Sequence, residues 1–138
     1  MTHLPLALAC IWLGMVVAIS IEAPLKFRAP GITLPLGLGI GRLVFRALNA
    51  SEIMLAAATA VTFALAPRPA AATVLLIALA VTLAVQVTAL RPRLEARAAT
   101  IIAGETPPKS STHLVYIALE GVKVLMLVAF AVTLLTTG

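Results

Sequence analysis

The residues best suited to chemistry are ionisable side chains set inside long apolar stretches of the 138-residue chain. Near the C-terminus, four polar side chains recur at spacings of three, four and three residues: His113, Tyr116, Glu120 and Lys123. This spacing places them on one face of a helix, with Glu120 and Lys123 in reach of an i,i+3 ion pair. An ionisable side chain at membrane depth costs roughly 2.5–3.5 kcal/mol, so this face needs a physical reason.

Other apolar stretches carry polar residues toward the same expected end: Glu22, Arg42, Glu52 and Gln86. We expect them to form one polar layer with the Glu120 face. Three interpretations of this layer are open. It can be an internal network that fixes helix register, a small cavity for an ion, proton or small polar ligand, or a polar face offered to another membrane protein.

Catalytic machinery is not visible in the sequence. There is no Ser/His/Asp set, cysteine pair, HExxH motif or phosphate-binding loop, so we predict no catalytic residues, no metal site and no cofactor. His3 and His113 are expected on opposite sides of the membrane and therefore cannot share a metal or haem. A membrane-embedded enzyme using Glu120 or His113 as general acid or base is the least favoured hypothesis, and we lean against an enzyme.

The composition places these residues in a membrane protein. Hydrophobic residues make up 62% of the chain and charged residues 11%, against about 45–50% and about 25% in soluble domains. The net charge of +5 does not indicate nucleic-acid binding. The basic residues fall in connections between apolar stretches and lack the interleaved aromatic residues of single-strand binders.

The elements that position the polar layer follow from the apolar stretches. We predict an all-α, single-domain chain with four antiparallel transmembrane helices, at about 4–23, 51–66, 70–90 and 113–136. Twenty helical residues reach about 30 Å, enough to cross the hydrocarbon core. Arg42 and Arg46, spaced i,i+4, predict a separate amphipathic helix over about 33–48 on the cytoplasmic side. A re-entrant segment is the alternative, because the glycines of 37–41 let backbones approach closely. Asn49 and Glu52 have the spacing of a capping box for the second span, and 91–112 is expected to be a basic loop.

The distribution of Lys and Arg predicts the orientation. The first and third connections hold most of the basic residues, whereas the second holds only Arg68. The positive-inside rule then puts both termini outside the cytoplasm and the long basic connections inside, in the cell (inner) membrane. Gly14, in a row of small residues, and the Gly37–Gly41 pair are candidate helix-packing positions.

Several short motifs resemble a known family. The junction Ile21-Glu22-Ala23-Pro24-Leu25-Lys26-Phe27-Arg28, the approach Gly41-Arg42-Leu43-Val44-Phe45 and the turn Arg91-Pro92-Arg93-Leu94 are similar to motifs of small four-helix membrane proteins like transmembrane protein 205. The stretch 28–35 departs from that pattern, so the chain looks like a divergent relative. The resemblance implies the four-helix topology and no particular reaction.

Two functions are compatible with these features. The first is a non-enzymatic accessory or interaction subunit of a membrane complex, whose partners are the lipid bilayer and a larger assembly. The second is a small homo-oligomeric transporter or channel for an ion, proton or small polar solute that uses the Glu/Lys layer.

Overall fold

A computed structural model describes residues 3–65 and 69–137. Arg68 and the expected end of the second span at residue 66 lie outside the described residues. The described elements follow one another in the order α1 (His3–Leu25), η1 (Lys26–Arg28), α2 (Leu34–Ala64), α3 (Ala70–Val85), η2 (Gln86–Leu90), α4 (Arg91–Ile102) and α5 (Thr112–Thr137).

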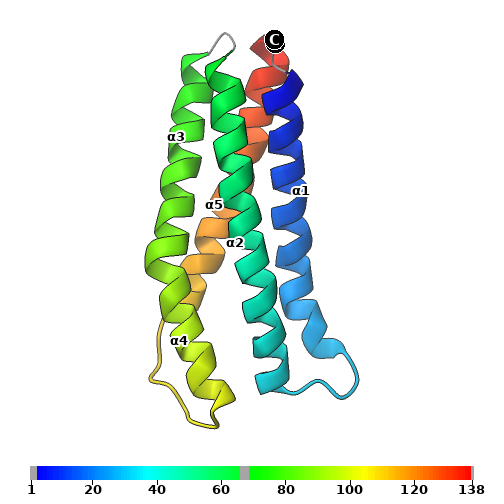
Figure 1. The fold of residues 1–138 in the computed structure, drawn as a ribbon, viewed down its shortest axis with the longest axis vertical. Coiled ribbons are helices and arrows are strands. Elements are labelled where there is room, and N and C mark those ends of the chain that lie inside the picture. The colour runs from blue at the N-terminus through cyan, green and yellow to red at the C-terminus, as the bar shows by residue number, and fades with distance from the viewer. Residues whose placement is uncertain (1–2, 66–68, 138) are drawn as a thin grey trace.

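The helices form an up-and-down bundle in which α4 extends α3 (Figure 1). Four continuous helical runs are long and apolar enough to cross a membrane, which confirms the predicted all-α class and the four candidate spans. The first residues of α1 and the last residues of α5 lie at the same end of the bundle (Figure 1). We call the other end, which carries the connections 29–33 and 103–111, the basic end.

The separate amphipathic helix is not found. α2 runs without a break from Leu34 to Ala64, a length of 31 residues, or about 46 Å. Asn49 is therefore helical and buried, and the capping box predicted for Asn49 and Glu52 is wrong. The helix instead starts at Thr33, whose hydroxyl accepts a hydrogen bond from the Leu36 backbone N–H at 3.2 Å. Apolar residues on both sides of Asn49 let one helix form where a surface helix and a span were expected.

The predicted basic loop is also largely helical. α4 covers Arg91–Ile102, so only the stretch from 103 to 111 connects it to α5. Pro92 would interrupt an ordinary α-helix because it lacks an N–H and its ring collides with the carbonyl four residues earlier. The preceding turn is a π-helix, Gln86–Leu90, in which the Arg91 N–H bonds to the Gln86 carbonyl. The wider turn lets the helix pass the proline.

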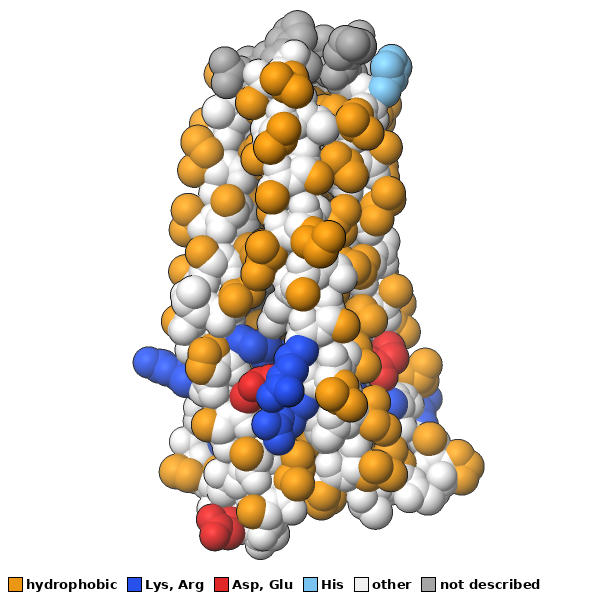
Figure 2. Space-filling view, viewed as in Figure 1, with side chains coloured by type: hydrophobic (Ala, Val, Ile, Leu, Met, Phe, Trp, Pro, Cys, Tyr) orange, Lys and Arg blue, Asp and Glu red, His pale blue; other side chains and the backbone are white. Residues whose placement is uncertain are grey.

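The apolar core fills the half of the bundle away from the basic end. Side chains from all four long helices meet there, among them Val16 of α1, Phe63 of α2, Leu79 of α3 and Phe130 of α5. Charged side chains gather in the lower part of the visible face, toward the basic end (Figure 2). The bundle is thus divided into an apolar half and a half with polar groups.

The two glycines of the GxxxG pair lie against the turn that follows α1. A Cβ atom at Gly37 would stand 2.3 Å from a ring carbon of Phe27, and one at Gly41 would stand 3.2 Å from the Lys26 Nζ. Gly14 faces outward, with nothing within 4 Å of its Cβ position. Gly37 and Gly41 therefore let η1 pack closely on α2, while Gly14 packs against nothing within the described residues of this chain.

We expect Gly37→Ala to lower the thermal stability of the detergent-solubilised protein, because the Phe27 ring must leave its seat on α2. Gly39→Ala is the matched control on the same helix, since nothing lies within 4 Å of its Cβ position. It should stabilise by roughly 0.5–1 kcal/mol through helix propensity alone. Equal melting temperatures for the two variants would contradict the seating of Phe27.

Candidate functional site

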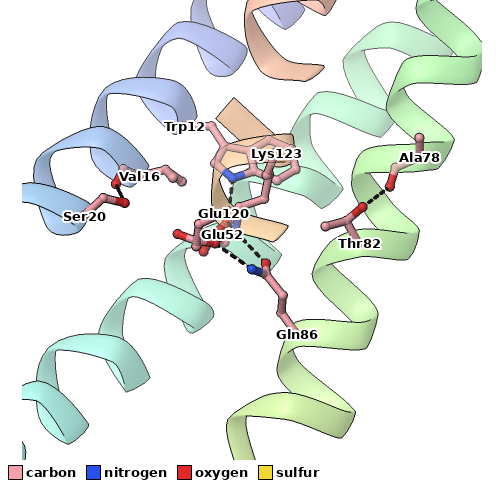
Figure 3. Close-up of polar contacts among 9 residues, drawn as sticks. All are labelled: Trp12, Val16, Ser20, Glu52, Ala78, Thr82, Gln86, Glu120 and Lys123. Atoms are coloured by element: carbon pink, nitrogen blue, oxygen red, sulfur yellow. Dashed lines mark hydrogen bonds and ion pairs between the residues drawn. The ribbon is translucent and has the colours of Figure 1, made fainter. Parts of the chain in front are cut away.

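Lys123 is the centre of a buried polar network in the middle of the bundle (Figure 3). Its side chain is completely buried, and its ammonium group contacts acceptors on three side chains. The contacts are Glu52 Oε2 at 2.6 Å, Glu120 Oε1 at 2.5 Å and Gln86 Oε1 at 2.8 Å. An ammonium group has three N–H donors, so the donor capacity of Lys123 is fully used.

Two further hydrogen bonds close the network. The Gln86 amide donates to Glu120 Oε1 at 2.8 Å, and the indole N–H of Trp12 donates to Glu52 Oε2 at 2.8 Å. The network thus joins α1, α2, η2 and α5. A buried charge is tolerated only when it is paired and hydrogen-bonded, and removal of one partner costs about 3–5 kcal/mol. These contacts therefore fix the register of the helices.

Helical periodicity brings the members inward. Buried or half-buried residues of α2 recur every three or four positions through Glu52, and Glu120 and Lys123 share a face of α5. Gln86 is the first residue of the π-helical turn, which directs its amide toward α5. Thr82, one turn away, donates instead to the Ala78 carbonyl of its own helix at 2.8 Å and stays outside the network (Figure 3).

The structure brings together four of the predicted site residues: Glu52, Gln86, Glu120 and Lys123. The others lie apart from this cluster. Glu22 pairs loosely with Lys26 at 3.8 Å on α1 and η1. Arg42, His113 and Tyr116 instead line a neighbouring cavity.

Sequence reasoning missed Trp12, which belongs to the network. A signal was present. It is the chain's one tryptophan, it stands within an apolar stretch, and a buried indole N–H needs an acceptor.

A cavity of about 1030 Å³ lies beside the network, toward the basic end. It is bounded by α1, η1, α2, α4 and α5, and Glu120 forms the part of its wall that it shares with the network. Its cationic lining comes from Lys26, Arg42, Arg91 and Arg97, with His113 at the start of α5. The cavity is at the upper end of the range of about 300–1,000 Å³ for small-molecule sites.

Arg91 is held in this wall by two aromatic rings. Its guanidinium carbon lies 4.6 Å from the centre of the Phe45 ring and 5.1 Å from that of Tyr116, and the two rings meet edge to face. Such cation–π contacts hold the guanidinium group beside the two rings. Its Nε and Nη1 atoms are buried without a hydrogen-bond partner in the described part of the chain. Sequence reasoning assigned Arg91 to a surface loop and therefore missed this role.

Other buried donors of the cavity wall are also unsatisfied. The Nε of Arg42 and the hydroxyl of Tyr116 have no hydrogen-bond partner among the described residues. The remaining cations are engaged. Lys26 pairs with Glu22, and Arg97 donates to the Pro108 carbonyl at 2.6 Å. The cavity therefore presents free donors from α2, α4 and α5.

Glu95, a half-buried carboxylate of α4, lies within electrostatic reach of Arg42 and Arg91 but forms its ion pair with another arginine. Glu95 of α4 is bound by Arg46 of α2 through two contacts of 3.0 and 3.4 Å. Within residues 3–65 and 69–137, neither Arg42 nor Arg91 has a carboxylate within ion-pair distance. The same residues contain no group of three His, Cys, Asp or Glu side chains that could hold a metal ion. The lining of the cavity thus holds four Lys or Arg side chains and one carboxylate, Glu120.

Comparison with known proteins identified no relative. No family model, no curated protein and no solved structure matches the chain. The similarity to the transmembrane protein 205 family stays a prediction that rests on the short motifs.

We expect Lys123→Met to lower the free energy of unfolding by about 3–5 kcal/mol, since it leaves two buried carboxylates facing each other. Glu52→Gln should cost less, because it keeps an acceptor for Trp12 and Lys123 and removes one negative charge. The measurement is thermal unfolding followed by the fluorescence of Trp12. Arg46→Met breaks an exposed pair and is the control, with little change expected. A Lys123→Met protein as stable as this control would show that the network does not hold the helices.

Proposed function

We propose that the protein is a small, non-enzymatic integral membrane protein that binds an anionic solute in the cavity beside the network. The observation that carries this proposal is Arg91, which two aromatic rings hold in the wall with buried, unpartnered donors. An unpaired buried donor costs free energy, and an anion that accepts from it recovers that cost. Arg42 and Tyr116 supply further donors to the same cavity.

The network lies next to the cavity and holds the helices that carry the binding residues. Glu120 lies at the boundary between network and cavity, but its carboxylate is occupied by Lys123 and Gln86. Its negative charge is thereby offset in part by Lys123, which it shares with Glu52. The ammonium group of Lys123 has all three donors engaged, whereas Glu52 Oε1 is buried without a partner among the described residues. The full engagement of Lys123 favours a structural part for it and leaves solute binding to the arginines.

We further propose that binding is the first step of transport. The packed core of Val16, Phe63 and Phe130 closes the bundle beyond the network. Passage of a solute would require this core to open, as expected for alternating access and not for an open channel. The lopsided distribution of Lys and Arg supports an orientation with the basic end in the cytoplasm of a cell with an inner membrane.

The anion-binding proposal predicts a saturable rise in melting temperature with at least one anion, because a ligand that binds only the folded state stabilises it. The probes are inorganic phosphate, citrate, dodecanoate and dodecyl phosphate at millimolar concentration, below the range in which salts act by exclusion. The Arg42→Gln/Arg91→Gln double variant should lose the rise. Alkylammonium salts are the matched cationic controls. The proposal is wrong if no anion raises the melting temperature of the unchanged protein more than it raises that of the double variant.

A second candidate, the accessory subunit, is favoured by the outer face of α1. Ala7, Cys10, Gly14 and Ala18 share this face, and all are exposed. Small residues in such a row let another membrane helix approach closely. The partner can be a second copy of the chain or a different membrane protein.

Cys10 offers a test of the second copy. If two α1 helices pack through this face, mild oxidation in the membrane should give a disulfide-linked dimer, and Gly14→Ile should abolish it. Gly39→Ile is the control on α2, where the Cβ position is likewise open. A monomer that copurifies with a stoichiometric partner would support the accessory role instead. A monomer that purifies alone would count against both.

A further inference from the structure

The cavity also has an apolar edge, formed by α1 and α5. Four apolar residues of α1 and α5 line it and are also exposed on the surface of the bundle: Val17 at 38%, Ile21 at 59%, Leu114 at 68% and Ile117 at 52%. In a membrane, side chains so exposed on apolar helices contact lipid chains. The edge of the cavity between α1 and α5 therefore carries apolar side chains that would face lipid.

The polar and apolar parts of the cavity are separated. The free donors come from Arg42 of α2, Arg91 of α4 and Tyr116 of α5, while the exposed apolar residues come from α1 and from the outward side of α5. A ligand that satisfies both parts has an anionic head at the arginines and a hydrocarbon portion between α1 and α5. A small hydrophilic anion would satisfy only the first.

We infer that the ligand is an anionic amphiphile with one hydrocarbon chain, bearing a phosphate or carboxylate head, which enters from the membrane between α1 and α5. This inference rests on the proposed anion binding and adds the ligand class. A volume of about 1030 Å³ accommodates a head and part of one chain, as in other sites that enclose most of a small ligand. The guanidinium group of Arg91, held beside Phe45 and Tyr116, can donate charge-assisted hydrogen bonds to either head.

The test uses the full chain in nanodiscs of zwitterionic phosphatidylcholine. Binding of radiolabelled dodecyl phosphate, dodecanoate and inorganic phosphate is measured against empty nanodiscs, which report simple partitioning into lipid. We expect saturable binding of at least one of the two amphiphiles, at least about tenfold tighter than that of inorganic phosphate. Arg91→Gln should weaken it by at least about tenfold, as expected for loss of a charge-assisted hydrogen bond. Arg93→Gln, at an exposed position of α4 outside the cavity lining, should leave it unchanged.

A second pair of variants tests the position of the ligand without removing charge. Gly121 lines the cavity and has nothing within 4 Å of its Cβ position, so Gly121→Leu fills space there without a clash. It should abolish binding of the amphiphile while raising helix propensity. Gly14→Leu makes the same change on a surface of α1 outside the cavity and should have no effect on binding.

Each outcome decides between the proposals. Inorganic phosphate bound as tightly as dodecyl phosphate would overturn the amphiphile while leaving anion binding in place. Binding that survives Gly121→Leu would overturn the position in the cavity. Displacement by two-chain phosphatidylglycerol at equal affinity would replace the single-chain ligand with a membrane lipid. No saturable binding of any of these probes would overturn both the inference and the proposed function.

Discussion

A completely buried lysine, Lys123, must be neutralised and fully hydrogen-bonded inside an apolar bundle, and the arrangement of the helices follows from this need. Three acceptors, on α2, η2 and α5, surround its ammonium group. The indole of Trp12 brings α1 into the same network through Glu52. Apolar packing alone has little preference between helix registers in lipid, because hydrocarbon contacts outside the bundle are as good as those inside. The directional bonds of the network supply that preference.

The network also divides the molecule. On one side, apolar side chains such as Phe63, Leu79 and Phe130 pack against one another. On the other, the helices separate enough to leave a cavity, and the arginines there keep buried donors free. An anion site binds best when its donors are held in place before the ligand arrives. The hydrogen bonds around Lys123 hold the helices, and Arg91 on one of those helices keeps its donors free. The aromatic contacts of Arg91 serve the same purpose.

Each departure from the predicted secondary structure has a physical cause that sequence patterns do not reveal. Asn49 and Glu52 resemble a helix start, yet in α2 they are inward-facing members of a continuous helix because Glu52 finds Lys123 and Trp12 as partners. Pro92 resembles a helix stop, yet the π-helical turn Gln86–Leu90 carries the chain past it. In both places a tertiary contact or a change of helix type overrides the local signal.

The sequence by itself determined the membrane class, the four apolar helices and the shared face of Glu120 and Lys123 on α5, because these depend on composition and on helical periodicity within one segment. Only the tertiary structure decided which polar residues meet. It excluded Glu22 from the network, added Trp12, and moved Arg91 from an expected loop into a cavity wall. The physical reason is that contacts between helices depend on rotation and register, which no single segment encodes, and which the network around Lys123 fixes only once the four helices are together.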